Sequence, residues 1–141
     1  MKHKEQLYRE FRYHKITPID RERILTWLKE GLETYPEIAF AYAHGSFIER
    51  KYYRDVDVAL WLNDVEKAWT FTVDISARLE VSLGKPVDLQ ILNKAPLPFQ
   101  HHVYTKGVLI LSRDEKRRSE VVNLTLRMYW DLRMLREQRT K

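Results

Sequence analysis

Apolar positions recur every three or four residues in some segments of the chain and form short, nearly continuous runs in others. The first such segment predicts a helix from Thr17 to about Thr34, with inward positions at Ile24, Leu25, Leu28 and Leu32. Thr17 is suited to cap this helix, because proline follows at the first helical position and an acid stands three residues after the cap. Tyr35-Pro36 then ends the helix, and the apolar run 38–43 predicts a buried strand.

The same reasoning extends to the C-terminus. Further strands are predicted at 56–62, 87–92 and 108–111, and further helices at 63–83, 99–104 and about 113–137. Asn63 and Ser112 are each followed three residues later by a glutamate, so both are expected to be helix caps. The final helix carries an apolar stripe that could pack on the sheet or face a partner, and packing is favoured (Val122, Leu126, Tyr129, Leu132 and Leu135, widened by Met128 and Trp130).

This order of elements predicts one α/β (α+β) domain spanning residues 1–141. No linker, internal repeat or low-complexity tract interrupts the elements, and the length suits a single domain. A hydrophobic content of 44% is enough for a substantial core at this length. The expected architecture is a mixed β-sheet of about four strands flanked by helices.

Composition excludes several classes of protein. The chain has no cysteine, so it cannot contain a disulfide framework, a thiolate metal site or a thiol nucleophile. No apolar run approaches the length of a membrane span and the N-terminus does not resemble a secretory signal, so we expect a cytoplasmic protein without membrane association. The net charge of +5 is concentrated at the two ends of the chain. Solvated helix surfaces are the favoured explanation, and direct nucleic-acid binding stays open.

Three aspartates are the candidate catalytic and metal-binding residues. Asp55 and Asp57 stand two positions apart at a predicted strand, so their side chains should leave the same face while the intervening valine points into the core. Asp88 lies on the next predicted strand, with Gln90 on the same face. Adjacent carboxylates repel one another unless a cation lies between them, and oxygen ligands favour magnesium, manganese or calcium over zinc. Such a site can hold two magnesium ions for displacement at phosphorus.

Gly45-Ser46 follows the strand predicted at 38–43 and is the candidate nucleotide-binding turn. A phosphate that approaches the backbone closely needs a residue without a side chain, and a small hydroxyl residue can add a donor. A short helix beginning near Phe47 would direct its free N–H groups at that phosphate. A nucleotide and a divalent metal are therefore expected together.

Together these residues resemble the nucleotidyltransferase superfamily with a DNA polymerase β type of palm, and above all its minimal nucleotidyltransferases (MNT). The resemblance rests on Gly45-Ser46, Asp55-Val56-Asp57 and Asp88, within a motif core of about 38–92. It implies that Asp55 and Asp57 ligate two magnesium ions, or manganese, that Asp88 helps to hold the ion that activates the acceptor, and that Gly45-Ser46 binds the phosphates of ATP.

The resemblance also implies a partner. Minimal nucleotidyltransferases are commonly the antitoxins of small helical HEPN-domain ribonuclease toxins, and they transfer AMP from ATP to a tyrosine of the toxin. The expected function is therefore that of a Mg-dependent antitoxin adenylyltransferase. Two alternatives stay open: a non-catalytic antitoxin that occludes the toxin, and a nucleotidyltransferase that acts on RNA or on a small molecule.

Other conspicuous residues are assigned no site. The Arg9 to His14 spacing matches a HEPN ribonuclease motif, but that motif belongs to a helical bundle without these strands. The pair His101-His102 lacks an acidic or cysteine companion at ligand spacing. Tryptophans lie on predicted apolar faces and are expected in the core (Trp27, Trp61 and Trp69).

Overall fold

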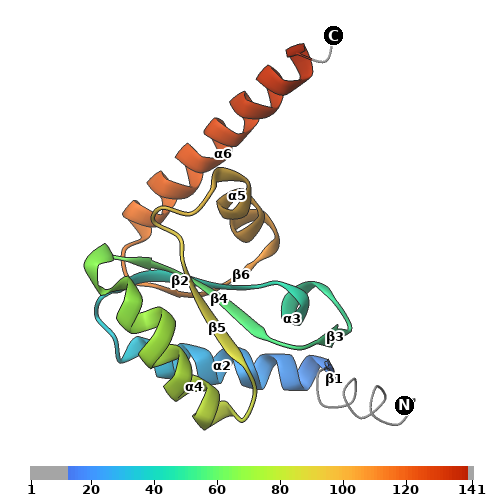
Figure 1. Cartoon of the computed structure of the whole chain (residues 1–141), viewed down its shortest axis with the longest axis vertical. Helices are drawn as coiled ribbons and strands as arrows, with labels where there is room; N and C mark the ends of the chain where they lie inside the picture. The colour runs from blue at the N-terminus through green and yellow to red at the C-terminus, as the bar shows by residue number, and fades with distance from the viewer. Residues whose placement is uncertain (1–12, 140–141) are drawn as a thin grey trace.

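The computed structural model describes residues 13–139 and contains a mixed four-stranded sheet (Figure 1). Its strands are β2 (Ile38–His44), β4 (Val56–Leu62), β5 (Val87–Ile91) and β6 (Val108–Ser112). Their order across the sheet is β5-β4-β2-β6, with β4 and β5 parallel and the other two pairings antiparallel. The predicted mixed sheet of four strands flanked by helices is therefore confirmed.

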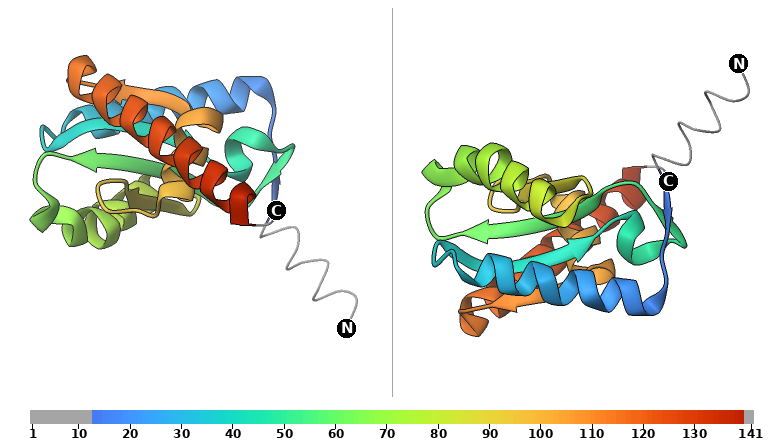
Figure 2. Two further views of the ribbon diagram at one scale, coloured as in Figure 1. Left: turned by 90° about the horizontal axis from the view of Figure 1, so that it is seen from above. Right: turned by 90° about the horizontal axis from the view of Figure 1, so that it is seen from below.

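Helices cover both faces of this sheet. On one face, α2 (Pro18–Glu33) and α4 (Ser76–Leu83) pack against the larger part of the core; on the other, α5 (Leu97–Lys106) and the start of α6 (Glu115–Arg139) enclose a second apolar cluster around Phe40 and Val103. Figure 2 views the molecule from these two sides. The central strand β2 is buried along its whole length, as its unbroken apolar run predicted.

Helix α2 begins as predicted, because the Thr17 hydroxyl accepts the N–H of Asp20 at 3.2 Å. The segment predicted as a helix at 63–83 is helical from residue 65 to residue 83, but it is not one regular α-helix. That segment contains a 3-10 turn η1 (Val65–Lys67), a wide π-helical turn η2 (Thr70–Ile75) and then α4. Its buried positions recur every four residues at 71, 75 and 79, and a wider turn keeps such a series facing the core.

Two other helix starts also differ from the prediction. Asp64 rather than Asn63 caps η1, and Asp114 rather than Ser112 caps α6, where its carboxylate accepts the N–H of Arg117 at 3.0 Å. Helix α5 starts at Leu97, two residues earlier than expected. A proline in the first helical turn costs little, since its missing N–H would have no partner within the helix, so the expected proline turn becomes helix instead.

Exposure corrects two further expectations. Trp69 is 67% exposed, so it is not a core residue, whereas Trp27 and Trp61 are partly buried against the core. Helix α6 projects from the body of the molecule (Figure 1), and the end of its predicted stripe, Leu135, is 59% exposed. The other four residues of the stripe are partly buried, and packing on the domain extends from Val121, which joins the second apolar cluster, to Tyr129, whose ring stacks on His101 of α5 at 3.7 Å.

The segment between β2 and β4 is structured. It contains a one-turn helix α3 (Ser46–Glu49) and a short strand β3 (Tyr52–Tyr53), which pairs with β1 (His14–Lys15) in a two-stranded antiparallel sheet. Phe47 and Tyr53 are fully buried and anchor this connection to the core. The Arg9 end of the sequence motif noted above lies outside the described residues. Between residues 13 and 139, no helix is long and apolar enough for a membrane crossing.

Candidate active site

Strand register brings Asp57 to the centre of the site. Asp57 pairs with His44 across the antiparallel β2–β4 ladder and with Asp88 across the parallel β4–β5 ladder. Its neighbours Val56 and Val58 are fully buried, so the alternation of β4 turns Asp57 to the opposite face. The structure therefore brings together two of the three predicted aspartates on adjacent strands.

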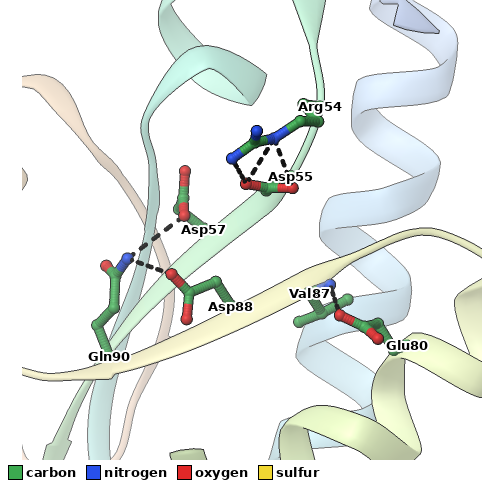
Figure 3. Close-up of polar contacts among 7 residues, drawn as sticks. All are labelled: Arg54, Asp55, Asp57, Glu80, Val87, Asp88 and Gln90. Atoms are coloured by element: carbon green, nitrogen blue, oxygen red, sulfur yellow. Dashed lines mark hydrogen bonds and ion pairs between the residues drawn. The ribbon is translucent and has the colours of Figure 1, made fainter. Parts of the chain in front are cut away.

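The start of β5, and with it Asp88, is fixed by helix α4. The buried Ser76 hydroxyl donates to the carbonyl of Val87 at 2.6 Å, and a Glu80 carboxylate oxygen accepts the N–H of Val87 at 3.1 Å (Figure 3). Both backbone groups of the residue before Asp88 are thus held by one helix. This arrangement limits how far Asp88 can move relative to Asp57.

Burial and like charges make Asp57 an unusual carboxylate. Desolvation, followed by the nearby charges of Asp88 and Asp55, raises the pKa of Asp57 to about 6, although Gln90 and Arg54 act in the other direction. A carboxylate that is difficult to ionise among other carboxylates is the electrostatic situation that a divalent cation relieves.

An amide bridges the two central aspartates. Gln90 Nε2 donates to Asp88 Oδ2 at 2.9 Å and lies 3.3 Å from Asp57 Oδ1 (Figure 3), while Gln90 Oε1 lies 2.5 Å from His44 Nε2. His44 is buried, its ring meets Phe99 of α5 edge-on at 5.4 Å, and desolvation lowers its pKa. A neutral imidazole therefore lies behind the amide.

Asp55 differs from its predicted setting. It occupies a bend immediately before β4 rather than the strand itself, and its carboxylate receives three contacts from the Arg54 guanidinium, the shortest 3.0 Å (Figure 3). Both side chains are partly exposed. In this arrangement Asp55 is directed to Arg54 and does not join the bridged pair of Asp57 and Asp88.

Gly45 lies directly against the Asp57 carboxylate. Its φ of 76° suits glycine, and a β-carbon there would collide with Oδ2 of Asp57 and lie 3.3 Å from its Cγ. Ser46 then begins α3, whose first N–H groups have no acceptor within the helix. The sequence-predicted turn is thus next to the aspartates, and glycine is required there by a contact within the protein.

The donor chemistry of these residues suits a hard divalent cation, but their side chains do not converge on one point. In the part of the chain that the structure describes, no group of three or more His, Cys, Asp or Glu side chains is close enough to hold a metal ion. Asp57 and Asp88 nevertheless supply oxygen ligands on adjacent strands, and Asp55 is two residues from Asp57. A rotation of the Asp55 side chain away from Arg54 would add a third carboxylate, so the residues fit a magnesium-type site.

Comparison with known families identifies the fold to which this site belongs. The sequence profile described as "Polymerase beta, Nucleotidyltransferase" matches residues 27–116, which is more than half of the chain. The chain belongs to this nucleotidyltransferase family. The match covers Gly45, Asp55, Asp57 and Asp88, so the family resemblance seen in the sequence is confirmed. No curated protein matches the chain.

Solved structures of toxin–antitoxin complexes share this fold. A chain of the tri-AMPylated Shewanella oneidensis HEPN toxin in complex with MNT antitoxin is 20% identical, with a TM-score of 0.64, over 84% of this chain and 93% of that chain. A chain of a toxin–antitoxin complex with AMP-PNP is 22% identical, with a TM-score of 0.65, over 81% and 93%. A third, from a complex with two Asp-to-Glu substitutions, is 20% identical, with a TM-score of 0.66, over 81% and 93%.

Sequence reasoning did not anticipate the roles of Gln90, His44 and Arg54. The alternation of β5 placed Gln90 on the same face as Asp88, which was the available signal. The contact of Gln90 with His44 depends on a third strand that lies two positions away in the sheet. Because the order of strands is not evident from local sequence, that contact could not be predicted. The pair His101-His102 forms no metal cluster within residues 13–139; instead His102 contacts Glu49 of α3 at 2.9 Å.

Proposed function

We propose that this protein is a Mg-dependent nucleotidyltransferase and the antitoxin of a HEPN/MNT pair. It transfers AMP from ATP to a tyrosine hydroxyl of its HEPN ribonuclease toxin. The whole chain, residues 1–141, forms one minimal nucleotidyltransferase domain, and it acts in the cytoplasm, where its donor ATP is abundant. The similar chains in complexes that contain an AMPylated toxin or AMP-PNP support this choice of donor and acceptor.

The observation that carries this proposal is the position of Asp57, between Asp88 in strand register and the side-chain-free surface of Gly45. Family membership supplies a transfer reaction at phosphorus, and these residues bring two carboxylates next to the start of a helix. We assign Asp55, Asp57 and Asp88 as the residues that hold divalent cations, and Gly45 and Ser46 as the phosphate-binding turn.

The transfer is a displacement at the α-phosphorus of ATP. The tyrosine oxygen forms a bond to that phosphorus, the bond to the pyrophosphate oxygen breaks, and the hydroxyl proton passes to solvent. Bound magnesium supplies charge that favours ionisation of the hydroxyl and screens the triphosphate. The protein orients the cations through its three carboxylates, and the first N–H groups of α3 and the Ser46 hydroxyl orient the phosphates.

A second candidate function has an observation in its favour. The contacts of Arg54 with Asp55 direct one of the three carboxylates away from the other two. An antitoxin that only occludes its toxin would not require the three to converge. The two functions differ in whether AMP becomes covalently attached to the toxin.

The deciding experiment combines this protein, ATP, Mg²⁺ and the HEPN partner that the proposal requires, which is to be sought in the neighbouring reading frame. We expect the intact mass of the HEPN protein to rise by one or more AMP units, with the modification mapped to tyrosine. Asp57→Asn should abolish the transfer, because it removes a metal-binding charge while preserving side-chain volume. Asp74→Asn, at an exposed position in η2, is the matched control and should transfer normally.

Complex formation separates the two candidates. If the wild-type protein binds the toxin and inhibits its ribonuclease without any gain in mass, the occluding function is correct and the catalytic proposal fails. Transfer of AMP to RNA that is added to the same mixture, with an unmodified toxin, would contradict both.

A further inference from the structure

We propose that Gln90 is a positioning residue, which holds the Asp57 and Asp88 carboxylates ready for a divalent cation, and that His44 acts through it. The inference rests on the proposed metal-dependent site and extends it to two residues that do not themselves bind the cation. It is argued from the amide's contacts with three neighbouring groups.

The direction of each hydrogen bond follows from the donors and acceptors available. Ionised carboxylates only accept hydrogen bonds, so the NH₂ end of Gln90 must face Asp57 and Asp88. Its carbonyl end therefore faces His44, and a carbonyl needs a donor, so Nε2 of His44 carries the hydrogen. Donation runs in one direction, from His44 to Gln90 and from Gln90 to the two aspartates.

The neighbouring strand leaves space for this arrangement. Gln90 pairs across the sheet with Ala59, whose small side chain lies on the same face as Asp57. The long Gln90 side chain can therefore fold back along the sheet to the carboxylate pair beside it, which is a diagonal contact between neighbouring strands. A bulky residue at position 59 would occupy that path.

His44 is itself held in place. It is 6% exposed, it lies at the end of the buried strand β2, and its ring contacts Phe99 at 5.4 Å. A fixed donor behind the Gln90 carbonyl prevents the amide from turning its oxygen towards the carboxylates, an orientation that would repel them. Helix α5 thereby contributes to the site through a series of contacts: Phe99 contacts His44, and His44 contacts Gln90.

Gln90 leaves room for a cation on both aspartates. Each carboxylate has several lone-pair positions, and Gln90 uses one oxygen of each. The remaining oxygens, Oδ2 of Asp57 and Oδ1 of Asp88, are not bonded to Gln90, and the amide sets the spacing of the two carboxylates. Groups that orient metal ligands in this manner typically contribute a factor of about 10–100 to metal affinity.

The test measures Mn²⁺ binding by electron paramagnetic resonance on the full chain without nucleotide. We expect Gln90→Met, which keeps the length of the side chain and removes the amide, to weaken Mn²⁺ binding about tenfold or more. His44→Phe, which keeps a ring against Phe99 and removes the donor, should weaken it by a smaller factor. The double variant should bind no more weakly than Gln90→Met alone, because His44 acts only through Gln90.

The matched control is Gln100→Met on α5, a partly buried glutamine that contacts Ala95 and Tyr104 rather than the aspartates. It should leave Mn²⁺ affinity unchanged. Unchanged or tighter binding by a folded Gln90→Met protein, checked by thermal unfolding, would overturn the inference, as would additive losses in the double variant. Absence of Mn²⁺ binding by the wild-type protein would instead refute the metal site of the proposed function.

Discussion

At the scale of single residues, the site places charge where the fold alone would not favour it. Asp57 lies in a partly buried position beside two other aspartates, and its pKa is raised to about 6. A group with a raised carboxyl pKa stabilises the fold when protonated and loses that contribution as pH rises through the folded-state pKa. The proposed metal site requires the ionised form of Asp57, so under that proposal metal binding and the stability of the metal-free fold are opposed at this residue.

Asp57→Asn should therefore stabilise the protein near neutral pH in a buffer free of divalent cations. The unfolded chain releases this proton near pH 4 and the folded chain near pH 6, so the wild type loses stability across that window and the variant does not. Urea unfolding at pH 4 and pH 7 measures the effect. A difference in unfolding free energy between variant and wild type that is equal at the two pH values would contradict the assigned electrostatics.

The second residue-scale prediction concerns Gly45. Gly45→Ala should cost roughly 1–3 kcal/mol for the positive φ alone, and it should also displace the Asp57 carboxylate, which the new methyl group would meet. Gly84→Ala is the matched control, because Gly84 has a φ of 75° with no heavy atom within 4 Å of an added β-carbon. Unfolding and Mn²⁺ titration together distinguish them. Both variants should lose stability, but only Gly45→Ala should lose metal affinity; equal metal affinity would show that the contact with Asp57 is unimportant.

At the scale of helices and strands, the sequence correctly predicted the features that depend only on neighbouring residues. The Thr17 cap and the buried run of β2 depend on nearby residues and are confirmed. The π-helical turn at 70–75 depends on how Phe71, Ile75 and Leu79 pack against the sheet, and the exposure of the end of α6 depends on the direction in which that helix leaves it. Both are tertiary effects, which periodicity alone does not specify.

The same distinction applies to the site. Asp55, Asp57, Asp88 and Gly45 could be located from spacing and neighbouring apolar residues. Strand register and side-chain rotation determine which carboxylates lie close together and which residue bridges them. The bridge from Asp57 through Gln90 to Asp88 and the contact of Asp55 with Arg54 could therefore be seen only in the three-dimensional structure.

The link between α4 and β5 gives a prediction at this scale. Ser76→Ala removes the buried hydroxyl that donates to the Val87 carbonyl at 2.6 Å, and leaves that carbonyl without this partner. We expect a loss of about 1–3 kcal/mol in unfolding free energy, measured with urea. Ser82→Ala, at an exposed position on the same helix, should change it little. Similar losses in both variants would mean that helix propensity rather than the α4–β5 contact is responsible.

At the scale of the whole molecule, the two ladders that meet at β4 connect the site to the entire sheet. His44 lies on β2, Asp57 on β4 and Asp88 on β5. Each of these three strands also contributes buried apolar residues to the core. A ligand that holds the carboxylates therefore also holds three strands in register. Ligand binding at this site should appear as stabilisation of the complete fold and not of one loop.

Mg²⁺ with ATP should accordingly raise the unfolding temperature of the wild-type protein as a single cooperative transition. Binding to the folded state alone stabilises it by about 2.7 kcal/mol when the free ligand is 100 times its dissociation constant.

Asp57→Asn should show little of this increase in unfolding temperature, because the cation loses a central ligand, even though the variant unfolds at a higher temperature than the wild type in divalent-free buffer. EDTA should reverse the wild-type increase. The two effects of one substitution have opposite signs, more stability without ligand and less response to it, and a general change in packing would not produce that combination. An increase of equal size in both proteins would show that Mg²⁺ and ATP bind elsewhere on the molecule.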